Sequence, residues 1–230
     1  MSTWLKKLTR TLGVGFLFAF AVTAQAFEAG QDYLVLKSSV VDEAAVASLR
    51  AEDPSAVQVV QFFSYGCHWC YLIENELSQW LERKPSNVKL IREPVVFQPG
   101  WRPLAKAFHT AVGLGVLDEK NHQILFEAVQ GASGSLSSDK KVRSFFTEQL
   151  SVSADDFDKV YDSFSINRQL DRTNALLRAL EISYIPVFVV NGPEVAYLVS
   201  VDTAGSQDAV FGVLDYLVEK VKKEQLTSQP

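Results

Sequence analysis

Cys67 and Cys70 are the only cysteines among the 230 residues, and His68 and Trp69 separate them. A disulfide between them closes a loop of four residues, and the chain entropy removed by so short a loop stabilises a fold by only about 2 kcal/mol. Reactivity therefore explains the pair better than structural cross-linking. Only a thiolate attacks a disulfide, so a CxxC pair of this kind indicates thiol–disulfide exchange.

The surrounding sequence assigns the two sulfurs different roles. An apolar run over residues 56–63 precedes a turn at 64–66, and apolar residues recur at helical spacing after Cys67. Cys67 is expected near a helix N-terminus, where unpaired N–H groups and the helix dipole stabilise a thiolate. Cys70, one turn further on, is expected to be more buried and to have a higher pKa. We predict Cys67 as the exposed attacking sulfur and Cys70 as the resolving one.

Other uses of a CxxC pair fit the sequence less well. The remaining soft metal ligands are His68, His109 and His122, and His68 lies inside the loop, where it could hardly join the cysteines on one zinc ion. Tyr71 follows Cys70 where a c-type haem motif has histidine. His109 and His122 are interpreted as ordinary helix-surface or core residues. No metal or other cofactor is expected beyond the redox-active disulfide, and an inert thiol pair is the open alternative.

The first 26 residues are typical of a secretory signal peptide. Three basic residues, an apolar stretch over residues 12–22 and a small-x-small sequence ending at Ala26 follow one another. The stretch is shorter than the about 20 residues that cross a bilayer core. We expect export and cleavage after Ala26, with an uncleaved N-terminal anchor as the alternative.

The charge of the chain excludes some partners. The net charge is −5, and loss of the signal peptide removes three basic residues and no acidic ones. The mature chain is therefore acidic and has no basic cluster, which argues against binding to nucleic acid or anionic lipid.

The number of cysteines is also informative for an exported protein. Exported proteins that depend on disulfides for stability usually carry several, whereas this chain has a single pair.

The predicted elements follow the order of an α/β domain interrupted by helices. Extended segments are predicted at 33–36, 56–63, 88–91, 95–97, 185–190 and 195–201, with a tight hairpin turn at Asn191-Gly192. Helices are predicted at 42–50, from Cys67 to about Pro85, at 104–112, 124–129, 142–146, from about 154, at 170–180 and at 207–222.

Three segments together resemble the DsbA family of thiol:disulfide interchange proteins, over essentially all of the mature chain. They are residues 62–71 with the CxxC pair, 125–130 (LFEAVQ) and 185–192 (IPVFVVNG). The resemblance implies a thioredoxin fold with an inserted all-helical domain. Residues 1–26 would form the signal peptide, 27–99 the first thioredoxin-like part, 100–181 the helical insertion and 182–230 the second thioredoxin-like part.

The resemblance also implies a periplasmic oxidase. The Cys67–Cys70 disulfide would be donated to newly exported, reduced proteins through a mixed disulfide at Cys67. A DsbB-type membrane protein linked to quinone would reoxidise the dithiol, and the enzyme would be a monomer. A disulfide isomerase or reductase, a peptide-binding chaperone-like module with incidental thiols and a small-molecule thiol transferase are the alternatives.

The family pattern adds a substrate-binding loop to the site. Pro186 would follow a cis peptide bond beside the disulfide, and the backbone of Ile185 would bind an extended substrate peptide. Trp69 could widen the apolar platform for substrate. The alternative is that Pro186 merely begins an edge strand.

Two residues depart from the family pattern. His68 occupies the first position between the cysteines, where the family often has Pro-His; there it is expected to face solvent, although it could assist Cys67 when protonated. Gln61 stands where the family commonly has a buried acid that exchanges a proton with the inner cysteine, and glutamine does not titrate. Proton transfer at Cys70 would need water, another acid such as Glu74 or a slower route, so we predict weaker pH control of turnover.

Overall fold

A five-stranded sheet lies at the centre of the computed structural model, which describes residues 27–36, 56–131 and 136–228. The strands are β1 (Leu34–Leu36), β2 (Val57–Phe63), β3 (Val88–Pro94), β4 (Val187–Asn191) and β5 (Ala196–Ser200). Their order is β1-β5-β4-β2-β3; β2 and β3 are parallel and the other pairs antiparallel. The predicted signal peptide and the helix predicted at 42–50 lie outside the described residues.

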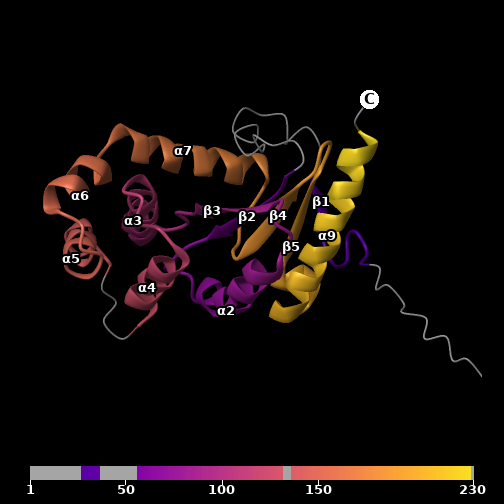
Figure 1. Ribbon diagram of the computed structural model, residues 1–230, viewed down its shortest axis with the longest axis horizontal. Helices are drawn as coiled ribbons and strands as arrows, with labels where there is room; N and C mark the ends of the chain where they lie inside the picture. The colour runs from indigo at the N-terminus through magenta and orange to yellow at the C-terminus, as the bar shows by residue number, and fades with distance from the viewer. Residues whose placement is uncertain (1–26, 37–55, 132–135, 229–230) are drawn as a thin grey trace, which may run out of the picture.

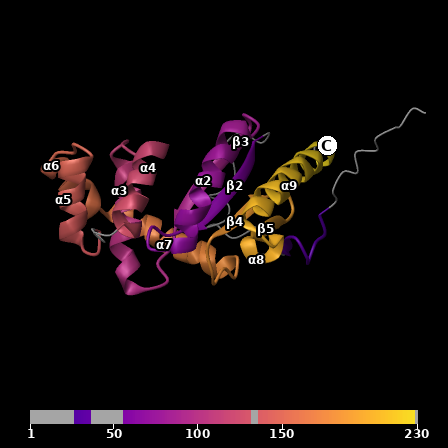
Figure 2. The same cartoon turned by 90° about the horizontal axis from the view of Figure 1, so that it is seen from below.

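Helices cover both faces of this sheet and extend beyond one end of it (Figure 1). They are α2 (His68–Arg83), α3 (Arg102–Gly113), α4 (Glu119–Gln130), α5 (Asp139–Gln149), α6 (Ala154–Tyr161), α7 (Phe164–Ala179), α8 (Val201–Ala204) and α9 (Gln207–Thr227), with a 3-10 turn, η2, at Pro99–Trp101. Helices α2 and α9 lie against one face (Figure 2), and α7 crosses the other. The sheet is thus the middle layer of three.

Alternation along β2 divides its side chains between the two faces of the sheet. Val57 and Val59 pack with α2 and α9, whereas Val60 and Phe62 pack with α7. All seven residues of β2 are buried, as expected for a central strand that is covered on both faces. Gln61 has the parity of Val57 and Val59, so its amide points toward α2.

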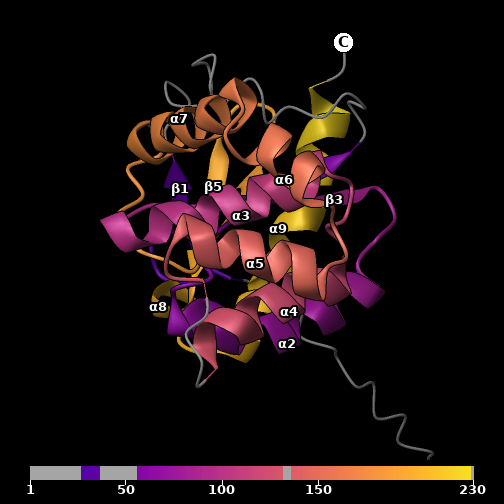
Figure 3. The same cartoon turned by 90° about the vertical axis from the view of Figure 1, so that its left-hand side faces the viewer.

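The helical block consists of α3, α4, α5 and α6, which lie together in front of the sheet in Figure 3. Its apolar residues form a core of their own, and this core also contains Cys67 and Cys70. Helix α7 leads from the block back to the sheet, where Leu176 and Leu177 pack on β2 and β4. The active-site end of α2 therefore lies at the junction of the sheet and the block. The exact domain limits stay a prediction.

Two local predictions about the strands are wrong. Residues 88–94 form a single strand that includes Pro94, and residues 95–97 lie outside it, although the N–H of Val95 still donates to the carbonyl of Phe63 at 2.8 Å. The hairpin between β4 and β5 has a four-residue loop, since Asn191 pairs with Ala196 and the N–H of Gly192 donates to the carbonyl of Val195. Pro193 lies inside this wider turn.

Candidate active site

Cys67 is the N-cap residue of α2, close to the position that the sequence predicts. Its backbone is extended, and its sulfur accepts the backbone N–H of Cys70 at 3.1 Å. The preceding turn is held by a hydrogen bond from the N–H of Cys67 to the carbonyl of Ser64. Gly66 is required here because a Cβ would collide with the indole ring of Trp101. The turn thus aims Cys67 at the free N–H groups of the helix.

Both cysteines are free thiols, and Cys67 is more buried than the sequence suggests. Cys67 is 7% exposed and Cys70 is fully buried. The expectation that Cys67 is an exposed sulfur is therefore wrong, although its order relative to Cys70 is right. The reason is the helical block, whose apolar core, with Ile185, packs around the pair.

The environment shifts the pKa values of the two thiols in opposite directions. The pKa of Cys67 lies below its ordinary value because the Cys70 thiol donates to its sulfur and the N–H groups of Cys70 and Trp69 add to this, against the effect of burial. The pKa of Cys70 is raised, above all by burial and then by its hydrogen bond with Cys67. At neutral pH the outer sulfur is the better nucleophile and the inner one holds its proton.

The loop before β4 lies directly against the outer sulfur. The peptide bond between Ile185 and Pro186 is cis, and the thiol of Cys67 is 3.9 Å from the carbonyl oxygen of Ile185. The strand itself begins at Val187. Two segments far apart in sequence, the CxxC turn and residues 185–186, therefore form one surface.

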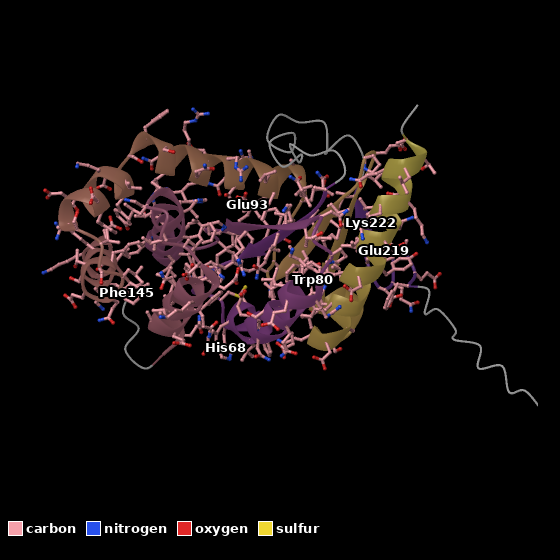
Figure 4. All side chains as sticks on the ribbon, viewed as in Figure 1. His68, Trp80, Glu93, Phe145, Glu219 and Lys222 are labelled. Carbon is pink, nitrogen blue, oxygen red and sulfur yellow. The ribbon has the colours of Figure 1, made fainter. Side chains whose placement is uncertain are left out.

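The two spacer residues face outward. Trp69 is 63% exposed, and His68 is also exposed. The Nδ1 of His68 lies 3.3 Å from Oε1 of Gln130 at the end of α4, which places the ring at the edge where α2 meets α4 (Figure 4). His68 thus contacts the helical block, and no hydrogen bond between its ring and the Cys67 sulfur is found among the described residues.

Gln130 also holds the turn before the cysteines. Its Nε2 donates to the carbonyl oxygen of Tyr65 at 2.7 Å. A single side chain of α4 therefore contacts the backbone on one side of Cys67 and the His68 ring on the other. In the sequence, Gln130 stands out only as the last residue of the 125–130 segment, and long-range packing is what brings it to the site.

A polar cluster is buried beneath the cysteines. Gln61 Nε2 donates to Glu74 Oε1 at 2.6 Å, and Glu74 Oε2 is 3.5 Å from Nε2 of His122. The hydroxyl of Tyr65 is 2.8 Å from Nδ1 of His122. Burial lowers the pKa of His122, and the charge of Arg92 lowers it further, against the opposing effect of Glu74. Both histidines taken as ordinary residues, His109 and His122, are buried, but His122 lies in this cluster.

Comparisons with known proteins identify the family. Residues 58–214 match the model of the DSBA-like thioredoxin domain. The chain belongs to the DSBA-like thioredoxin domain family. Proteins named thiol:disulfide interchange protein DsbA are similar to it: that of Pseudomonas aeruginosa is 30% identical, covering 93% of this chain and 94% of its own, and that of Pseudomonas syringae pv. tomato is 32% identical, covering 87% and 89%.

Solved structures of DSBA-like proteins agree with the fold. The crystal structure of Pseudomonas aeruginosa DsbA matches with a TM-score of 0.71 at 27% identity, covering 84% of this chain and 94% of its own. Reduced DsbA1 from Neisseria meningitidis matches with a TM-score of 0.71 at 22% identity, covering 89% and 100%, and supports the fold alone. The predicted thioredoxin fold with inserted helices is confirmed.

Proposed function

We propose that this thiol:disulfide oxidoreductase of the DSBA-like family oxidises cysteine pairs in exported proteins, with the Cys67–Cys70 disulfide as the oxidant and no other cofactor. The observation that carries the proposal is the opposite environment of the two sulfurs. The Cys67 sulfur accepts N–H and thiol hydrogen bonds, whereas Cys70 is fully buried. A stabilised Cys67 thiolate favours the reduced enzyme, and this makes the disulfide a strong oxidant.

The exchange has two steps. A substrate thiolate attacks the sulfur of Cys67, the S–S bond to Cys70 breaks, and a mixed disulfide forms at Cys67 while Cys70 takes the electron pair and a proton. A second substrate thiolate then attacks the substrate sulfur of the mixed disulfide, and Cys67 leaves as the thiolate. The substrate gains a disulfide and the enzyme is left as the dithiol.

Substrate binding would use the surface next to Cys67. The carbonyl oxygen of Ile185, 3.9 Å from the sulfur, can accept a backbone N–H from an extended peptide. Such backbone pairing accepts many sequences. The exposed indole of Trp69 lies on the same helix end and offers apolar contact area to the substrate.

The proposal also includes the compartment in which the enzyme acts and the protein that reoxidises it. We place the enzyme in the periplasm after cleavage at Ala26, acting as a monomer and reoxidised by a DsbB-type, quinone-linked membrane protein. The signal-like sequence of residues 1–26 supports export. None of the helices in the described parts of the chain is both long and apolar enough to cross a membrane.

Two serine variants test the proposal. Cys67→Ser is expected to abolish oxidation of a reduced model protein. In Cys70→Ser, the Cys67 thiolate should attack glutathione disulfide, release one glutathione thiolate and remain as a mixed disulfide with glutathione, detected by mass spectrometry, because no second thiol resolves it. Unchanged assistance of folding by Cys67→Ser would favour a chaperone-like module instead. A strongly reducing equilibrium with glutathione, together with an ordinary pKa for Cys67, would favour a reductase or isomerase.

A further inference from the structure

A carboxylate that the exchange steps do not use is buried on the face of the sheet opposite α2. Glu93 is 1% exposed and lies at the end of β3, beneath α7 in Figure 4. Its partner in the parallel register is Phe62, whose side chain packs with α7, so the side chain of Glu93 points to the same face. A buried carboxylate stays ionised only when charged or hydrogen-bonding partners surround it.

Both oxygens of this carboxylate contact α7. The hydroxyl of Thr173 donates to Glu93 Oε2 at 2.7 Å, and the guanidinium of Arg172 donates to Glu93 Oε1. Burial raises the pKa of Glu93, while the charge of Arg172 and the two hydrogen bonds act against this effect. Two adjacent residues of α7 therefore hold the end of β3.

Helix α3 adds a neutral group to this contact. The side chain of His109 is 8% exposed, and burial, followed by the charge of Arg172, lowers its pKa to about 4. At neutral pH the ring is therefore uncharged, and the charge that balances Glu93 is that of Arg172.

The end of β3 lies beside the end of β2, where the CxxC turn begins. The N–H of Val95, two residues after Glu93, donates to the carbonyl of Phe63 at 2.8 Å. Phe63 is the last residue of β2, and the carbonyl of the next residue, Ser64, accepts the N–H of Cys67. The backbone beside Glu93 is therefore joined by hydrogen bonds to the backbone that leads into the turn.

Trp101 provides a second contact between this region and the turn. Residues 95–101 lead from β3 to α3, and the Trp101 indole lies against Gly66, where a Cβ would come within 2.3 Å of the indole nitrogen. Trp101 also packs against the apolar core of the helical block and against that beneath α7, as does Ile185. The position of residues 95–101 thus fixes the backbone directly before Cys67.

The geometry points to Arg172 as a positioning residue for the Cys67 sulfur. Arg172 holds Glu93 and the end of β3, and residues 95–101 hold the turn that directs the sulfur toward the N–H of Cys70, 3.1 Å away. Because α7 leads from the helical block to the sheet, the same contact links the block to the redox centre (Figure 1). The inference deepens the proposed function and rests on its redox chemistry.

Loss of the Arg172 charge should weaken the thiolate at Cys67. In Arg172→Met, Glu93 is buried without its cation, so it takes up a proton or moves toward water, and the end of β3 moves with it. The turn is then less firmly held, and the pKa of Cys67 should rise by about one unit. One unit is a tenfold change in the ratio of thiolate to thiol, so the equilibrium constant for oxidation of glutathione by the disulfide should fall up to about tenfold.

Two measurements on the purified protein test Arg172. The pKa of Cys67 is read from the ultraviolet absorbance of its thiolate, and the oxidising strength from the equilibrium with glutathione. Arg172→Lys keeps the charge and should recover most of both wild-type values. Arg168→Met makes the same chemical change one turn earlier on α7, at an exposed residue, and should leave both unchanged. A folded Arg172→Met with wild-type values would overturn the inference, even if its free energy of unfolding is lower.

A double variant tests the route to the sulfur. Trp101→Leu should raise the pKa of Cys67 as Arg172→Met does. The double variant Arg172→Met/Trp101→Leu should show less than the sum of the two shifts, because both changes act through one turn. Full addition of the shifts would overturn the route through Trp101.

Thr173→Val keeps the inference testable if Arg172→Met does not fold. It removes the other hydrogen bond to Glu93 at nearly constant volume and should raise the pKa of Cys67 by a smaller amount. In that case an unchanged pKa in Thr173→Val would overturn the inference. These equilibria need no protein substrate, and loss of redox activity in Cys67→Ser tests the proposed function separately, so the two failures are distinguishable.

Discussion

The backbone N–H of Cys70 points at the sulfur of Cys67, 3.1 Å away. The inner cysteine thus stabilises the charge of the outer one while its own thiol is buried and keeps its proton. This relationship couples redox state to pH, because only the reduced protein contains the Cys67 thiolate.

The first prediction concerns the stability of the reduced protein. The pKa of Cys67 is lower in the folded than in the unfolded chain, where it is about 8.5. The resulting stabilisation is present above the unfolded value and is lost as pH falls through the folded one. Denaturant unfolding should therefore show the reduced protein losing stability relative to the oxidised protein on acidification.

Cys70 produces the opposite dependence at high pH. Its folded pKa is raised, so above about pH 8.5 the unfolded chain loses this proton and the folded chain keeps it. The stability of the reduced protein relative to the oxidised protein should therefore fall again as pH rises above this value. Cys67→Ser should abolish the acid-side loss, and an unchanged acid side in this variant would contradict the assignment to Cys67.

The second prediction concerns Trp69. Its indole is 63% exposed, so Trp69→Ala should change the free energy of unfolding by no more than about 0.5 kcal/mol. An apolar side chain that a substrate covers contributes about 1.5–3 kcal/mol, so KM for a cysteine-containing peptide should rise about tenfold or more. The rate with dithiothreitol should not change, because this small dithiol does not cover the indole.

Phe164 provides the matched control for Trp69. It is 77% exposed at the start of α7, and α7 and α2 lie on opposite faces of the sheet (Figure 1). Phe164→Ala should leave KM for the peptide unchanged. An equal rise in KM for both variants would show that Trp69 is not part of a local substrate platform.

The third prediction concerns Gln130. Gln130→Leu leaves the carbonyl of Tyr65 and the ring of His68 without this partner, and loss of a partly buried hydrogen bond costs about 1–3 kcal/mol. Urea unfolding should show this loss. The alkylation rate of Cys67 should also rise, because the turn that encloses its sulfur is less firmly held.

Gln123→Leu is the control on the same helix. Gln123 contacts Glu127 at 3.1 Å on an exposed part of α4, so its replacement should change the free energy of unfolding and the alkylation rate little. Equal alkylation rates for the Gln130 variant and the wild type would show that α4 does not restrain the turn.

Sequence reasoning located the parts of the site that depend on neighbours in the chain. Cys67 and Cys70 are placed by the strand, turn and helix that contain them, and the apolar spacing of α2 indicates its buried side. Glu74 was named from the sequence only as another acid that could exchange a proton with Cys70, and it lies on the buried side of the same helix. These positions needed no knowledge of distant segments.

Contacts between residues that are distant in the sequence could not be predicted in this way. His122 and Gln130 contact Tyr65 over sequence separations of 57 and 65 residues. Gln130 ends the 125–130 segment that carries the family resemblance, but the local sequence of α4 does not show which residue either side chain contacts. The same packing explains why Cys67 is buried, since the apolar core of the helical block surrounds it. Helical periodicity predicts that a helix has an apolar face but does not identify its partner.

The last prediction concerns Gln61→Glu. The wild-type amide lies 2.6 Å from Glu74 Oε1, so the variant places two carboxyl groups at hydrogen-bond distance, and one of them must hold a proton. Its folded pKa would exceed the unfolded value of about 4.3. Stability relative to the wild type should therefore be greatest below that value and fall as pH rises toward the folded pKa.

The same variant should change the kinetics. The pH–rate profile of reduction by dithiothreitol should gain a limb in the same range, because a second titrating group then lies near Cys70. Gln61→Leu, which removes the amide and adds no acid, should show no added limb. An unchanged profile in Gln61→Glu would mean that protons reach Cys70 by a path that avoids position 61, and the weaker pH control expected from glutamine would then be wrong.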